Sequence, residues 1–238
     1  MTVTADALDR STQATGAVTV ASMARDWARK APRQIAMREK DFGIWQEYDW
    51  ERTWELIDTA AHGLLALGVE VGDRVAIHSE DRPEWVILDL ATVAVRGITV
   101  GLYPTNPTPE VEYLVGDCTP RVFFAEDQEQ ADKILEVDPA RAASVERILY
   151  VEPRGFGDYP DPRLLFWADF LELGREHRAA HPHAVEQRMG QAADDDIMTL
   201  VYTSGTTGPP KGAMLSNVNA RFAIDRIIGF PDRVPDGV

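Results

Sequence analysis

The sequence predicts an α/β fold with mixed, largely parallel sheets flanked by helices. Short apolar runs of strand length recur along the chain, and stretches with helical spacing of apolar residues separate them. Prolines stand at the first turn of two of these helical stretches, a position that proline favours. Strands that alternate with helices pair largely in parallel. The 238 residues, 45% hydrophobic and 26% charged, are enough to bury a core.

Three elements are expected before this alternation begins. Thr19 can cap a helix that runs through Trp27 and ends near Ala31, because a proline follows. Two strands then flank an Asp-Phe-Gly turn and predict a β-hairpin. A second helix, with apolar residues at helical spacing, stops at Gly68. The hairpin strands are expected over residues 35–40 and 44–50, and the second helix over 51–67.

The regular alternation begins at residue 74. Strands are expected over residues 74–79, 98–102, 121–126, 146–152 and 197–202, the last being the final strand. Helices are expected over residues 83–95, 109–117, 128–136 and 167–178. A linker follows around residues 180–184, and a last helix begins after Ser216.

Charge and cysteine content narrow the class of protein. The formal net charge of −15 disfavours nucleic acid as a partner, which needs a basic face. The single cysteine, Cys118, favours a reducing compartment, the cytoplasm, and is interpreted as a small buried residue rather than a nucleophile. No signal peptide is expected, and the longest apolar run, residues 85–95, is too short to span a bilayer. Peripheral association with a membrane and the oligomeric state are left open.

The segment TLVYTSGTTGPPKG, residues 199–212, carries the candidate chemistry. A buried strand ends at Tyr202, and the segment is expected to lead from it into a helix. Ligands of α/β sheets bind beyond the carboxyl ends of the strands. Hydroxyl groups and backbone N–H groups in such a loop form a cradle for an anion, with phosphate as the expected ligand. Lys211, placed after two stiff prolines, adds a mobile positive charge.

Two other interpretations of this segment compete with the phosphate cradle. A Ser/Thr/Gly linker is the commonest origin of such a composition, but the preceding buried strand and the placed lysine argue against it. A P-loop of the NTPase type has the same loop length from Gly205 to Lys211. However, Pro210 replaces its second glycine and removes an N–H group, and Gly212 replaces the Ser or Thr after the lysine. The P-loop interpretation is therefore rejected.

The stretch YTSGTTGPPKGAMLSNVN, residues 202–219, resembles the nucleotide-binding signature of the adenylate-forming (AMP-binding) superfamily. This superfamily includes acyl-CoA synthetases, luciferases and the adenylation domains of peptide synthetases. Residues 68–91 and 100–127 are similar to further stretches of acyl-CoA synthetases, in versions typical of long-chain fatty-acid–CoA ligases. The resemblance covers about residues 18–230.

The resemblance implies ATP-dependent activation of a long-chain fatty acid, through an acyl-adenylate and pyrophosphate, to acyl-CoA. ATP with Mg²⁺ and coenzyme A as co-substrate would be the small-molecule partners, beside the fatty acid. The resemblance assigns no catalytic residue and no metal ligand within this sequence. The residues that it implies for the ATP phosphates are Thr203, Ser204, Gly205, Thr206, Thr207, Gly208 and Lys211.

The chain departs from the family pattern in two respects. Asn217 stands where family members often have His, and it cannot carry the positive charge of that residue. The downstream Y-G-x-T-E and T-G-D segments and the C-terminal lid domain of the family are not found in the sequence. We therefore expect residues 1–17 to be a mobile tail and residues 18–238 an incomplete AMP-binding domain. The alternative function is a non-catalytic fragment with at most weak nucleotide binding.

Overall fold

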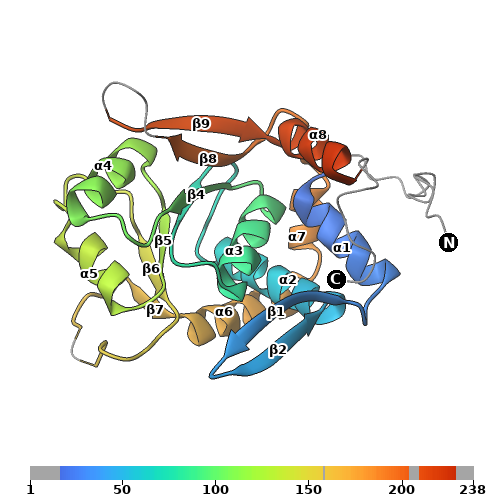
Figure 1. The fold of residues 1–238 in the computed structure, drawn as a ribbon, viewed down its shortest axis with the longest axis horizontal. Helices are drawn as coiled ribbons and strands as arrows, with labels where there is room; N and C mark the ends of the chain where they lie inside the picture. Colours follow the sequence, from blue (N-terminus) through green and yellow to red (C-terminus); the bar gives the residue numbers. More distant parts are fainter. Residues whose placement is uncertain (1–16, 158, 204–208, 229–238) are drawn as a thin grey trace.

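A seven-stranded sheet forms the centre of the protein in the computed structural model, which describes residues 17–157, 159–203 and 209–228 (Figure 1). The strand order is β7-β6-β5-β3-β4-β8-β9. Neighbouring strands pair in parallel from β7 to β8, and β9 pairs antiparallel with β8. The strands are β3 (Arg74–His78), β4 (Ile98–Leu102), β5 (Val122–Ala125), β6 (Arg147–Tyr150), β7 (Leu164–Phe166), β8 (Ile197–Thr203) and β9 (Lys211–Ser216).

Helices cover both faces of this sheet and enclose two apolar cores. One core lies under α1, α2, α3, α6 and α7, and the other under α4 and α5. Alternate residues of the strands supply the two cores; for example, Phe124 enters the first and Phe123 the second. The helices are α1 (Val20–Lys30), α2 (Trp50–Ala66), α3 (Pro83–Ala94), α4 (Thr108–Cys118), α5 (Gln128–Glu136), α6 (Trp167–Ala180), α7 (Ala184–Met189) and α8 (Asn217–Ile228).

The chain reverses its direction across the sheet after β4. From β3 it passes through α3, on one face, to the neighbouring β4. From β4 it passes through α4, on the other face, to β5 on the far side of β3. The connections that leave β3 and β4 therefore diverge at their carboxyl ends. Such a divergence is where open α/β sheets place their ligand sites.

A separate hairpin, β1 (Ile35–Asp41) and β2 (Ile44–Asp49), packs near α2. Phe42 and Gly43 form its turn, and both have positive φ angles, 44° and 84°. Figure 1 shows this hairpin on the side of the molecule away from β8 and β9.

The expected elements are confirmed, with four corrections to their number and order, and the strand before the candidate loop, expected to be buried, is only half-buried. Residues 164–166 form the short strand β7, and the expected linker at residues 180–184 leads into the short helix α7. The strand at 197–202 is not the final one, because β9 follows it. For the same reason the candidate loop does not lead into a helix. It leads into an antiparallel strand, and α8 begins only at the far end of that strand.

Candidate functional site

The candidate loop connects the two strands of the β8–β9 hairpin at the carboxyl end of β8. Thr203, the last residue of β8, pairs with Lys211, the first residue of β9. Residues opposite each other in an antiparallel pair project from the same face, so the Thr203 hydroxyl and the Lys211 ammonium can approach one anion together. Both residues are exposed. The other predicted site residues, Ser204, Gly205, Thr206, Thr207 and Gly208, lie outside the described residues.

Helix α4 anchors the hairpin at this end. The hydroxyl of Tyr113 donates a hydrogen bond of 2.9 Å to the carbonyl oxygen of Pro210, just before β9. The hydroxyl of Tyr202 donates one of 2.5 Å to a carboxylate oxygen of Asp117. Burial, with the Asp117 carboxylate next in effect, raises the pKa of Tyr202 far above its usual range. Figure 1 shows α4 beside this end of the hairpin. The two legs of the loop are thus fixed to a common helix.

Gly212 makes room for a close packing contact on the downstream leg. A Cβ atom at this position would lie 3.1 Å from the ring of Tyr202, its partner on β8. Such a contact is tighter than a side chain normally makes. The glycine after Lys211 in the motif therefore has a packing reason, which is the fit of the Tyr202 ring over β9.

The turn that follows β4, the strand beside β8, is held by side chains of β3 and α5. His78, at the end of β3, is fully buried and its Nε2 lies 3.0 Å from the carbonyl oxygen of Tyr103. Because a carbonyl only accepts, this Nε2 carries the proton. The ammonium of Lys133 donates to the carbonyl oxygen of Pro104 at 3.0 Å. Burial, with the Lys133 charge next, lowers the pKa of His78 to about 4. A neutral histidine and a lysine thus hold two successive carbonyl groups.

The carboxyl ends of β3 and β5 are joined through Glu126. Its carboxylate accepts hydrogen bonds from the backbone N–H of Glu80 at 2.8 Å and from the hydroxyl of Ser79 at 3.3 Å. Arg82 lies 3.4 Å from the same carboxylate and 2.7 Å from Glu84. In these contacts the charged side chains of Arg82, Glu84 and Glu126 bind one another and the backbone. We therefore interpret the carboxyl ends of β3 and β5 as structural.

Asn217, the departure from the family pattern, lies at the other end of the hairpin. It is buried, its Nδ2 donates to the carbonyl of Ala193 at 2.9 Å, and its backbone N–H donates to Asp196. Ser216, its neighbour, pairs with Ile197 at the start of β8. At about 3.3 Å per residue, six residues place this end about 20 Å from Thr203. A positive charge at position 217 would therefore be remote from the loop.

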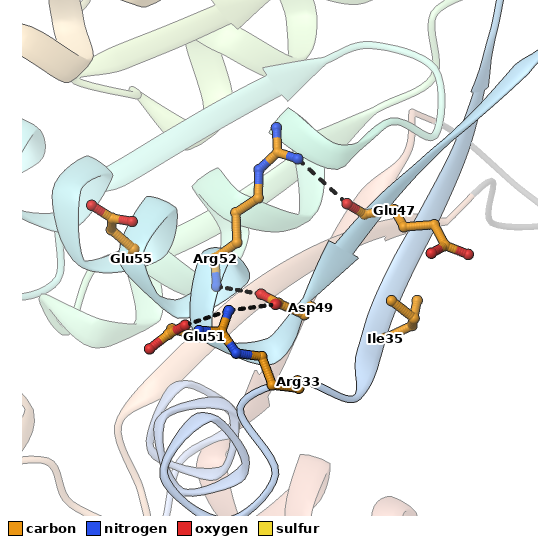
Figure 2. Close-up of a pocket in the computed structure, with 7 residues that line it drawn as sticks. All are labelled: Arg33, Ile35, Glu47, Asp49, Glu51, Arg52 and Glu55. Atoms are coloured by element: carbon orange, nitrogen blue, oxygen red, sulfur yellow. Dashed lines mark hydrogen bonds and ion pairs between the residues drawn. The ribbon is translucent and has the colours of Figure 1, made fainter.

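The described part of the chain also contains a cavity of about 450 Å³ at the base of the β1–β2 hairpin. Figure 2 shows Arg33 directed at Asp49 and Glu51, and Arg52 close to Glu47. The ion pairs from Arg33 measure 3.4 and 2.9 Å, and the Arg52 guanidinium donates to the Glu47 carbonyl at 3.3 Å. These charges hold the hairpin to the start of α2. No residue of the candidate loop lines this cavity, so we do not assign the cavity to the candidate site.

A scan against protein families gives one match that spans most of the chain. The family described as AMP-binding enzyme matches residues 24–234. The chain belongs to the AMP-binding enzyme family. This confirms the resemblance inferred from residues 202–219, which lie inside the match.

Two curated members of the AMP-binding family illustrate the relationship. The long-chain-fatty-acid–CoA ligase FadD15 of Mycobacterium bovis is 34% identical over 200 residues, which cover 84% of this chain and 31% of that protein. The long-chain-fatty-acid–CoA ligase ACSBG2 of Xenopus laevis is 29% identical over 202 residues, covering 85% of this chain and 26% of that protein. The chain thus spans less than a third of the length of these relatives.

Solved structures confirm the α/β fold of an AMP-binding enzyme. A provisionally assigned long-chain-fatty-acid CoA ligase from Rhodopseudomonas palustris superposes with a TM-score of 0.69 at 21% identity. The superposition covers 89% of this chain and 48% of that one. The anthranilate CoA ligase AuaEII, in complex with anthranoyl-AMP, gives a TM-score of 0.68 at 23% identity over 90% of this chain and 37% of that one.

The sequence identified both ends of the candidate loop but missed the residues that position it. Tyr113, Asp117 and Lys133 belong to helices far from the motif in sequence, and no local pattern marks them. His78 could have been noticed as an ionisable side chain that directly follows the apolar residues Val75, Ala76 and Ile77 of its strand. The structure therefore adds a supporting frame, from β3, α4 and α5, to the predicted loop.

Proposed function

We propose that the chain is part of a long-chain fatty-acid–CoA ligase, which activates a fatty acid with ATP through an acyl-adenylate and transfers it to coenzyme A. One observation carries the proposal. Thr203 and Lys211, at the two ends of the candidate loop, form a pair at the carboxyl edge of a largely parallel sheet. The curated relatives named above are long-chain-fatty-acid–CoA ligases, which supports the choice of substrate class.

The residues at the loop fit a triphosphate. A hydroxyl donor and an ammonium group on one exposed face suit oxygen anions, and the hairpin legs are held by α4. In this proposal Thr203 and Lys211 hold the ATP phosphates together with Ser204, Gly205, Thr206, Thr207 and Gly208. No three His, Cys, Asp or Glu side chains gather as a metal site within the described ranges. In this proposal Mg²⁺ enters the site bound to the phosphates of ATP.

The chemistry requires charge stabilisation from several sides. Attack of the fatty-acid carboxylate on the α-phosphorus of ATP forms the acyl–phosphate bond and releases pyrophosphate. The carboxylate attacks in its ionised form, so this step needs no general base. The crowded, negatively charged phosphorus centre is stabilised by positioned cations and donors. Thr203 and Lys211 supply one side of such a site. The alternative proposal for this polypeptide by itself is accordingly a weak nucleotide-binding module without catalysis.

The test measures ATP binding and ATP–pyrophosphate exchange on the same preparation. We expect calorimetry to detect weak, Mg²⁺-dependent ATP binding that Lys211→Met abolishes. The matched control is Lys30→Met, which removes an exposed lysine at the end of α1 and should leave binding unchanged. Loss of binding in both variants, or in neither, would contradict the assigned role of Lys211. Exchange that requires both palmitate and Lys211 would show that the chain catalyses adenylation unaided and would exclude the non-catalytic alternative.

A cytoplasmic location is part of the same proposal. Cys118 is buried, and burial raises the pKa of its thiol to about 12, which suits a structural residue in a reducing compartment. Among the helices that the structure describes, none is long and apolar enough to cross a bilayer.

A further inference from the structure

The turn of the β1–β2 hairpin exposes three large apolar side chains within four residues. Phe42, Ile44 and Trp45 have relative exposures of 95%, 66% and 60%. Isolated apolar residues are ordinary on a protein surface, but a contiguous group marks an interaction site. Phe42 lies in the turn, and Ile44 and Trp45 follow it on β2, opposite Asp41 and Lys40 of β1.

Phe42 is unfavourable at this place for a second, independent reason. Its φ angle is 44°, in the left-handed region that glycine and asparagine adopt readily and a phenylalanine does not. The adjacent Gly43 lies in open space, because a Cβ atom built there would meet nothing within 4 Å. The chain thus keeps an exposed and strained aromatic residue where Asn would fold with less strain. Residues held against their backbone preference cluster at functional sites.

The charges around the tip favour a neutral surface over a charged one. The Arg38 guanidinium lies 3.0 Å from the Glu47 carboxylate, which neutralises one pair. The Lys40 ammonium lies 5.8 Å from the centre of the Trp45 ring, next to the acidic Asp41. No basic cluster accompanies these residues, and the whole chain has a net charge of −15. An anionic membrane would repel such a protein.

We propose that the tip formed by Phe42, Ile44 and Trp45 binds the interface of a lipid bilayer with zwitterionic headgroups. Aromatic rings with a neighbouring lysine are the side chains that occupy this interface. A hairpin end carrying three apolar residues matches the 5–10 Å depth to which interfacial elements enter. The choice of a lipid rests on the proposed function, because a long-chain fatty acid partitions into bilayers. With the tip in the membrane, the strands β8 and β9, on the other side of the molecule, stay in water, where ATP is (Figure 1).

The test is co-sedimentation of the full chain with phosphatidylcholine vesicles, without ATP, fatty acid or coenzyme A. We expect Phe42→Asn to lower the partition coefficient about tenfold or more, the effect of losing one large apolar side chain. The same substitution should raise the midpoint of thermal unfolding, because Asn tolerates the positive φ angle. Phe42→Leu should keep most of the binding. The matched control is Val71→Asn, at an apolar residue of 48% exposure in another turn, which should leave binding unchanged.

Three results would overturn the proposal. Equal partitioning of wild type and Phe42→Asn would exclude a role of the tip. Stronger binding to phosphatidylglycerol vesicles than to phosphatidylcholine would contradict the charge argument. Sedimentation equilibrium that shows a dimer abolished by Phe42→Asn, with no vesicle binding, would assign the tip to a second copy of the chain. Since no substrate is present, a failure of the proposed ligase function would not affect these measurements.

Discussion

The Nδ1 atoms of His62 and His177 lie 2.9 Å apart in the contact between α2 and α6. One imidazole must donate the hydrogen and the other must accept it, so protonation of both rings breaks the bond. His62 is fully buried, and its Nε2 has no partner among the described residues. Burial, followed by the charges of His177, Arg178 and His181, lowers the pKa of His62 to about 4.

We expect the free energy of unfolding to fall as the pH is lowered from about 6.5 to about 4. In this window the unfolded chain protonates His62 near its ordinary pKa of 6.5, while the folded chain does so only near 4. The unfolded state therefore binds more protons, and stability is lost towards acid. The loss would reach at most about 3 kcal/mol, reduced by solvent screening.

Urea unfolding at pH 7 and pH 5 tests this expectation with His62→Gln. The variant should lose less stability between the two pH values than the wild type does. His78 also has a lowered pKa, so part of the acid sensitivity should persist in the variant. The control is His183→Gln, at an exposed position before α7. An equal pH dependence of wild type and His62→Gln would refute the role of the pair.

Removing the hydroxyl of Tyr113 should loosen the candidate loop at its downstream leg. Tyr113→Phe deletes the hydrogen bond to the Pro210 carbonyl and should cost about 1 kcal/mol of stability. Hydrogen exchange should become faster at the amides of Lys211 and Gly212, and ATP binding should weaken. Tyr103→Phe, at a residue of 73% exposure, is the control. Unchanged exchange at positions 211 and 212 would show that α4 does not restrain the loop.

Gly174 on α6 permits the close approach of α2. A Cβ atom at this position would lie 2.1 Å from the carbonyl oxygen of Thr59, which no side-chain rearrangement can relieve. We expect Gly174→Ala to cost about 3 kcal/mol or more. Gly157→Ala, where a Cβ atom meets nothing within 4 Å, should change stability by less than about 0.5 kcal/mol. The midpoints of urea unfolding compare the two variants, and similar midpoints would contradict the packing argument.

The elements that were predicted well are those with strong local signals. The expected helix at residues 128–136 agrees with α5 at both ends, because Asp127 and Gln130 form a capping box at its start. The strand β9 was missed for the opposite reason. Its sequence, KGAMLS, has no β-branched residue, and four of its six residues are exposed. It forms a strand because it pairs with β8. The three-residue β7 and the six-residue α7 are too short to carry a periodic pattern.

In the candidate site, too, the residues of the local motif could be predicted and those that make distant contacts could not. The motif alone predicted Thr203 and Lys211, since loop composition is a local property. Tyr113 and Asp117 were not predictable, because their partners Pro210 and Tyr202 lie 97 and 85 residues away in the chain. His177 likewise packs against His62, 115 residues earlier. Contacts at such separations leave no pattern in one sequence.

The pairing of β8 with β4 has a consequence for folding. Thr199 meets Thr99 across 100 residues, so this junction closes a much longer chain segment than the neighbouring β3–β4 pair does. Closing a longer loop costs more chain entropy, and distant pairings form slowly. During synthesis, β4 emerges early and remains an open sheet edge until the strand that carries Thr203 leaves the ribosome. The β8–β9 hairpin is therefore expected to be among the last parts of this sheet to assemble, and a nascent chain would depend on protection of β4 until then.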